Sequence, residues 1–290
     1  MGYLIAVSLL WAFSFGLIKN QLVGLDSYWV ATIRLGLASL VFLPFLRPRA
    51  IQFKLAGQYL GIGAIQFGMM YVLYIASFQH LQAHEVAMFT IFTPIYVVIF
   101  AGLRQRRVNL VALAAAGVAG VGAAVLRWQD GISVEAFTGF LMLQGANLCF
   151  AVGQVLYRDT RRRYPEGKDH GLFAWLYIGA VLGAGLLALV LGDLGNFSPS
   201  TTQWGILLYL GVLATGLGFF GWNLGATKVA TGTLAVANNW LIPLAVLVAL
   251  VVFGESASLP HLLLSLGIMA LAVVIAKRSA RRETDQTAAA

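Results

Sequence analysis

Ten apolar segments, each near the ~20 residues that cross a bilayer, are joined by short loops, and positive charges gather on alternate loops. Of the 19 Lys and Arg residues, all but Lys19, Arg34 and Arg127 lie in loops that would share one side of a membrane. Basic loops stay on the cytoplasmic side of multi-pass proteins. The pattern therefore predicts a polytopic membrane protein with both termini in the cytoplasm.

Composition agrees with a membrane protein, because 60% of the 290 residues are hydrophobic and only 10% are charged. So few charges cannot cover a soluble fold of this size. The net charge of +8 sits in short loops rather than along one exposed face. We therefore expect the lipid bilayer, and no nucleic acid, as the partner of these charges.

The apolar runs are continuous rather than alternating, which favours helices that satisfy their own backbone in lipid. The expected helices cover residues 2–20, 27–46, 54–79, 82–103, 108–126, 137–157, 171–191, 203–227, 231–253 and 259–276. The predicted fold class is an all-α integral membrane protein with ten transmembrane helices.

The two halves of the chain resemble each other. An offset of 149 residues places Pro94 on Pro243, and an offset of 139 places Trp11 on Phe150. Five helices is an odd number, so the second half must enter the membrane upside down. We expect two inverted five-helix repeats, residues 1–130 and 131–282, followed by a disordered tail, 283–290.

Charge supports the inversion, because the fourth helix ends in Arg104-Gln105-Arg106-Arg107 whereas the ninth ends in Phe253-Gly254-Glu255-Ser256. Inverted repeats are typical of secondary carriers, in which two similar halves rock around a midplane site. The repeat thus points from fold to transport.

The layout resembles the EamA branch of the drug/metabolite transporter superfamily. The features that carry the resemblance are Trp11, Arg34, the two prolines and the Phe253-Gly254-Glu255 end of the ninth helix. The resemblance implies a bacterial inner-membrane carrier, often an exporter of amino acids or related metabolites. This chain departs from the family in having Arg104-Gln105-Arg106 where a Glu commonly follows the fourth helix.

Polar and aromatic side chains recur on single helix faces at about 100° per residue. We expect these faces to line a central cavity that binds substrate. The candidate residues are Trp11, Phe15, Gln66, Met70, Phe89, Phe92, Asn147, Gln154, Thr215, Phe219, Trp222, Asn238 and Asn239. The alternative is that the amides only join neighbouring helices.

Three further residues are candidates for gating or coupling. Arg34 lies inside an apolar segment, where a charge normally faces protein or water. Glu85 is expected in the same half of the membrane, so the two are hypothesised to pair, directly or through water; the alternatives are a fixed structural ion pair and hydrogen bonds from Arg34 to carbonyl groups. His80 and His84 are four residues apart, but the spacing lacks a third metal ligand, so no metal is expected. Proton sensing by His80 is the better functional hypothesis, while the favoured alternative is that these residues are simply solvated at the membrane interface.

The leading functional prediction is a secondary active transporter that exports small amphipathic metabolites, amino acids first, by alternating access. Other small organic solutes, such as carboxylates, sugars or drugs, are the alternative substrates. An intramembrane enzyme is disfavoured, since protease and hydrolase motifs are lacking in the sequence, and a channel is disfavoured because the inverted repeat is typical of carriers. No cofactor is expected, whereas coupling to protons and a monomeric or homodimeric state are left open.

Overall fold

The computed structural model describes residues 2–48, 51–104, 106, 110–128, 133–164, 169–227 and 231–288. Within these ranges, the side chains of 2–3, 112, 223–227, 231–240, 276–277 and 279–288 lie outside the described part. The described residues are helical apart from short connections, which confirms the predicted all-α class.

Ten helical spans follow one another along the chain. The first repeat contains span 1, α1 (Gly2–Gln21); span 2, α2 (Ser27–Phe42) with η1 (Leu43–Phe45); span 3, α3 (Phe53–Gly63), η3 (Ala64–Met69) and α4 (Met70–Ser77); span 4, α5 (Ala83–Phe89), η4 (Thr90–Phe92) and α6 (Thr93–Arg104); and span 5, α7 (Leu110–Leu126). The second contains span 6, α8 (Val134–Arg163); span 7, α9 (Asp169–Leu191), followed by the short helix η5 (Leu194–Asn196); span 8, α10 (Thr201–Leu208), η6 (Tyr209–Leu217) and α11 (Gly218–Thr227); span 9, α12 (Thr231–Val251); and span 10, α13 (Leu259–Ala288).

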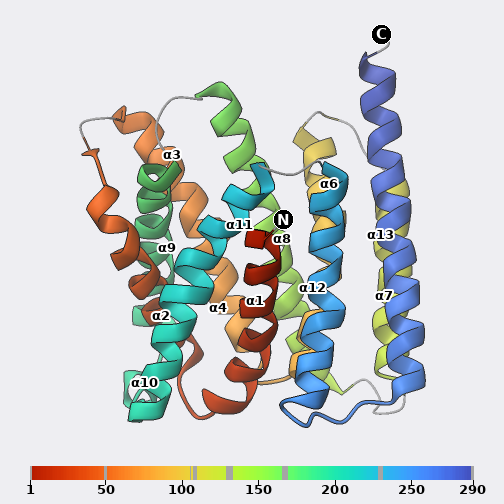
Figure 1. Ribbon diagram of the computed structural model, residues 1–290, viewed down its shortest axis with the longest axis horizontal. Coiled ribbons are helices and arrows are strands. Elements are labelled where there is room, and N and C mark those ends of the chain that lie inside the picture. Colours follow the sequence, from red (N-terminus) through yellow and green to blue (C-terminus); the bar gives the residue numbers. More distant parts are fainter. Residues whose placement is uncertain are drawn as a thin grey trace.

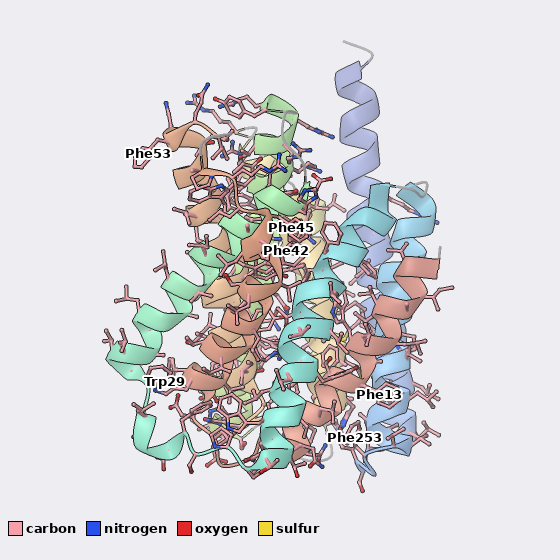
Figure 2. The ribbon with its side chains drawn as sticks, turned by 60° about the vertical axis from the view of Figure 1, so that its left-hand side comes forward. Phe13, Trp29, Phe42, Phe45, Phe53 and Phe253 are labelled. Atoms are coloured by element: carbon pink, nitrogen blue, oxygen red, sulfur yellow. The ribbon has the colours of Figure 1, made fainter. Side chains whose placement is uncertain are left out.

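Seven of these spans are long and apolar enough to cross a membrane, and three shorter apolar helices within the described residues complete the ten. Apolar side chains cover the outer faces of the bundle, as Figure 2 shows. On α9, for example, Leu182, Leu186 and Val190 lie one turn apart and are 63%, 64% and 71% exposed. Such a stripe would be unfavourable in water and is expected in contact with lipid.

The inversion is visible in how spans pair. The α2 helix packs against η6, while α9 packs against η3, so spans 2 and 8 repeat the contact of spans 7 and 3. Likewise α1 packs against α12, and α6 packs against α8. The α7 and α13 helices pair at one side of the bundle, at the right in Figure 1. Each such pair joins one repeat to the other.

The bundle has two distinct ends. We call the end at which η1, α6 and α8 finish the basic end; it is the upper end in Figure 1, where α13 also finishes. At the opposite end α1, α4, α7, α9 and α12 finish. The predicted repeat boundary at 130/131 falls within residues 129–132, outside the described residues.

Two helices run further than the sequence suggests. The α8 helix continues to Arg163, six residues beyond the expected end, and α13 continues to Ala288. The helix assignment thus extends into residues 283–288, and the disordered tail stays a prediction. Both extensions are rich in Arg and free of Gly and Pro, and arginine has high helix propensity in water.

Candidate functional site

Spans 3 and 8 each contain a π-helical segment, and the two segments occupy equivalent places in the repeats. The offset of 149 residues places η3, Ala64–Met69, on 213–218, which overlaps η6, Tyr209–Leu217. A π-helical turn holds an extra residue and commonly occurs at functional sites. The centre of the molecule is built around these two segments.

Span 3 crosses span 7 at a close backbone contact that fixes η3 in place. A Cβ atom at Gly63 would lie 1.9 Å from the carbonyl oxygen of Leu176, and one at Gly179 would lie 2.0 Å from that of Leu60. Only glycine fits at either position, because a side chain would collide with the backbone of the neighbouring helix.

Thr215 of η6 joins side chains from three other spans. Its hydroxyl accepts a hydrogen bond from Nη2 of Arg34 at 3.1 Å and lies 2.9 Å from the Tyr71 hydroxyl. Its carbonyl oxygen accepts a hydrogen bond of 2.8 Å from the Tyr177 hydroxyl. Arg34 also lies over the Tyr71 ring, with Cζ 4.8 Å from the ring centroid, a cation–π contact.

An aromatic cluster adjoins this polar centre. Trp11 of α1 lies 4.9 Å from Phe219 and 5.0 Å from Trp222, measured between ring centroids. The indole nitrogen of Trp11 donates to the carbonyl oxygen of Ala214 in η6 at 2.7 Å. Phe219 continues the cluster towards the polar centre, 6.4 Å from Tyr71. The predicted faces of spans 1 and 8 thus meet.

A second polar group surrounds Asn147 on α8. The Asn147 amide nitrogen donates to the carbonyl oxygen of Phe89 at 2.9 Å, and its oxygen accepts from the Thr93 hydroxyl at 3.2 Å. These bonds stabilise span 4 at the point where Pro94 prevents a continuous α-helix and η4 intervenes. Phe89 and Phe92 both pack edge-on against Phe140. The Asn147 side chain is therefore already hydrogen-bonded to span 4.

The other predicted binding residues lie near these groups. Phe15 is buried and packs against Tyr74. Gln66 and Met70 are buried on span 3, where the Gln66 side chain packs against Gly153. Gln154 is half-buried on α8. Asn238 and Asn239 belong to α12, but their side chains lie outside the described residues.

The opposite end carries a group of charged and ionisable side chains that we call the ion network: Lys19, His84, Glu85, Arg127 and Glu255. Arg127 binds both carboxylate oxygens of Glu85, with Nη2 at 3.0 Å from Oε2. Lys19 donates to the carbonyl oxygen of Phe78 at 2.8 Å. Lys19 and Arg127, two of the three basic residues that lie outside the predicted cytoplasmic loops, thus have partners at this end.

Glu255 links the second repeat to the first. Its carboxylate accepts hydrogen bonds from the backbone N–H groups of Ala83 and His84, at 2.8 and 3.0 Å, and lies 2.7 Å from Nδ1 of His84. Burial raises the pKa of Glu255, but the hydrogen bonds from His84 and Ala83 outweigh it and hold the pKa below its usual range. Glu255 is therefore an anionic cap on α5.

The residues before Glu255 explain its position. Gly254 has a φ of +67°, a left-handed conformation that ends α12 and that glycine adopts without strain. The N–H of Glu255 donates back to the Ala249 carbonyl at 3.1 Å. The Phe253 ring, labelled in Figure 2, occupies the space left by Gly16 on α1, because a Cβ at Gly16 would lie 2.1 Å from the ring. The Phe253-Gly254-Glu255 segment thus joins span 9 to spans 1 and 4.

The hypothesis that Arg34 pairs with Glu85 is wrong in this structure. The α2 helix packs against η6 and α9, whereas α5 packs against α12. Glu85 is instead paired with Arg127. His80 contacts Gly139 through its Cβ, and His84 pairs with Glu255, so the two histidines do not form one site.

Several central residues escaped the sequence prediction: Phe67, Tyr71, Tyr74 and Tyr177. They were missed on span 3 because the regular 100° periodicity does not hold through a π-helical segment, which shifts the face presented by the residues after it. A signal was present in the density of aromatic residues between 67 and 78.

Ten apolar spans in two inverted repeats, meeting at a buried polar and aromatic centre, define a multi-pass membrane transporter. The chain belongs to the EamA-like transporter family. The model of that family matches residues 1–128. A probable biotin transporter of Pseudomonas aeruginosa is 45% identical over 98% of this chain and 99% of its own. The biotin transporters of Escherichia coli K12 and Salmonella typhimurium are 37% identical over 99% of this chain and 96% of theirs.

A solved crystal structure supports the fold. It shares only 18% sequence identity with this chain but superimposes with a TM-score of 0.63 and covers 97% of both chains. The likeness concerns the architecture alone.

Proposed function

We propose that this protein is a biotin carrier. The observation that carries the proposal is the full-length similarity, at 37–45% identity, to proteins named as biotin transporters or probable ones. Biotin replaces the amino acids expected from the family resemblance. It belongs to the alternative class, small organic carboxylates.

The chemistry of the centre suits biotin. Biotin carries a bicyclic head with a ureido group, a thioether and a valerate chain that ends in a carboxylate. The Trp11, Phe219 and Trp222 cluster provides aromatic surface for the compact head and its chain. Gln66 is buried, and its Oε1 has no hydrogen-bond partner among the described residues. An acceptor of this kind fits the N–H donors of a ureido group.

Transport would proceed by alternating access. In this structure Glu255 and Phe253 of the second repeat contact His84 and Gly16 of the first repeat at the opposite end. At the basic end, the described inter-repeat ion pair is Arg104 with Asp159, at 3.1 Å, and both side chains are at least one-third exposed. Breaking the contacts of Glu255 and Phe253 would let the repeats rock and change the access to the centre. Glu255 and His84 would then act as the gate.

We also propose that the basic end faces the cytoplasm of a bacterial cell and that the inner membrane is the location. The clustering of basic residues on alternate loops supports this orientation. The named relatives all come from bacteria.

The test is solute counterflow in proteoliposomes. Purified protein is reconstituted, the vesicles are loaded with unlabelled biotin, and entry of labelled biotin is followed with and without a pH gradient. Saturable accumulation that excess biotin abolishes is expected from a carrier. A panel of labelled amino acids serves as the competing class. Counterflow of an amino acid without counterflow of biotin would overturn the proposal.

A further inference from the structure

Arg34 is a buried cation whose donors are largely unused. Its side chain is 3% exposed, about a third of the way along span 2. Among the described residues it forms no ion pair, and its Nε and Nη1 atoms have no hydrogen-bond partner. Only Nη2 is bonded, to the hydroxyl of Thr215.

A guanidinium cannot relieve this situation by losing its proton, since arginine stays charged in proteins. A buried charge without a counter-ion is costly, and the cation–π contact with Tyr71 offsets only part of the cost. Arg127 illustrates the ordinary solution, because it holds the Glu85 carboxylate with two of its nitrogens. The Arg34 site lacks the corresponding anion within the described part of the chain.

The hydrogen bond to Thr215 leaves one edge of the Arg34 guanidinium free to bind a ligand. Nη2 has two hydrogens, and Thr215 accepts one of them. The other, together with the N–H of either Nε or Nη1, forms a pair of parallel donors. Two parallel donors match the two oxygens of a carboxylate. Tyr71 covers one face of the guanidinium and Thr215 fixes its direction, so the fork is oriented before an anion arrives.

We infer that Arg34 is the substrate carboxylate site of the transporter. The inference rests on the proposed function, and it names the part of biotin that the site binds: the valerate carboxylate. The aromatic cluster begins next to the fork, through Tyr71 and Phe219, so the chain and head of the substrate extend from the charged end towards Trp11 and Trp222. Arg34 is then a binding residue and not the partner of Glu85.

This assignment predicts discrimination by charge. Biotinamide has the same head and chain as biotin but carries a neutral amide where biotin has its carboxylate. Binding to purified protein in nanodiscs should favour biotin over biotinamide by at least about tenfold, the size of one charge-assisted hydrogen-bond contact. In Arg34→Gln, biotin should bind no better than biotinamide. Arg34→Lys keeps the charge but not the fork, and should show an intermediate preference.

Arg104→Gln is the matched control, because Arg104 is half-exposed at the basic end and is paired with Asp159. This variant should keep the preference of the unmodified protein. If Arg34→Gln aggregates on size-exclusion chromatography, binding of the two ligands to the unmodified protein and to Arg34→Lys still tests whether Arg34 binds the carboxylate. Equal binding of biotin and biotinamide to the unmodified protein would overturn the assignment of Arg34, whereas failure to bind either would overturn the proposed function.

Discussion

Glu255 and His84 are 171 residues apart in sequence, yet the Glu255 carboxylate contacts both the ring and the backbone N–H of His84. The first residue belongs to the end of span 9 and the second to the start of span 4, spans that occupy equivalent positions in the two inverted repeats. The acidic end of the ninth span is therefore used as a cap on its own repeat partner.

Glu255→Gln should weaken this cap. The substitution removes the negative charge but keeps the shape, so hydrogen bonds from Ala83 and His84 lose their charge assistance. We expect the free energy of unfolding to fall by about 1–3 kcal/mol. Thermal unfolding in detergent measures the effect, with Glu135→Gln, at an exposed position on α8, as the control. Equal melting temperatures for all three proteins would show that the cap contributes nothing.

The same contact gives a pH dependence with a definite sign. The folded-state pKa of Glu255 lies below its ordinary value of 4.5. Its stabilising contribution is therefore complete above that value and is lost as the pH falls from 4.5 through the folded-state pKa. The unmodified protein should lose more stability than Glu255→Gln between pH 6 and pH 3. Melting curves across that range check this, and parallel curves would contradict it.

Gly63→Ala should disrupt the crossing of spans 3 and 7, because the added Cβ would meet the Leu176 carbonyl oxygen at 1.9 Å. Overpacking of this kind costs about 1–3 kcal/mol. Gly61→Ala on the same helix is the matched control, because its Cβ would meet nothing within 4 Å. It should be neutral, or stabilising by up to about 1 kcal/mol, since glycine is unfavourable inside a helix. The two melting temperatures should therefore diverge, and a similar change in both would refute the crossing geometry.

Trp11→Phe removes the indole donor that satisfies the Ala214 carbonyl while keeping an aromatic ring in the cluster. We expect a loss of about 1–3 kcal/mol in stability, because a buried acceptor is left without its donor, together with weaker biotin binding. Trp29→Phe is the control, since the buried indole nitrogen of Trp29 has no hydrogen-bond partner in the described structure. Isothermal titration and melting curves measure both effects. Unchanged affinity in Trp11→Phe would remove Trp11 from the proposed site.

The orientation can be tested with single cysteines in a Cys149→Ala background. Phe53→Cys places a thiol at the basic end, where the side chain is 95% exposed, and Val23→Cys places one at the opposite end, where it is 69% exposed. A thiol reagent that cannot cross the inner membrane should label only Val23→Cys in intact cells whose outer membrane is permeable to it. After lysis both positions should react. Labelling of Phe53→Cys alone in intact cells would invert the assignment.

The sequence predicts the spans well because hydrophobic length and loop charge act along one dimension, the membrane normal. The same information does not say which spans are neighbours around the bundle. Arg34 and Glu85 are predicted in the same half of the membrane, but their helices pack against different partners, and only the three-dimensional arrangement brings Arg34 to Thr215 and Glu85 to Arg127. The sequence predicts the membrane half of a residue, but it does not predict the neighbours of that residue around the bundle.

Helix faces were predictable where the helix is regular. The Trp11 and Phe15 face of α1 and the Asn147 face of α8 do point into the molecule, as their periodicity indicates. Tyr71 was missed because η3 precedes it. Substrate class was beyond reach, since the aromatic and amide residues of the centre suit many small amphipathic molecules.

The two π-helical segments let spans 3 and 8 accept a change of length that an ordinary helix would not. A π-helical turn holds an extra residue, so deleting one residue from Ala64–Met69 would allow an unbroken α-helix to form. The residues after the deletion would keep their present face, and Tyr71 would still be directed towards Thr215. The same deletion from the regular α3 helix would instead turn the residues on its two sides by about 100° relative to each other. Span 3 would then still cross the membrane, but its two halves would no longer present their side chains to the same centre.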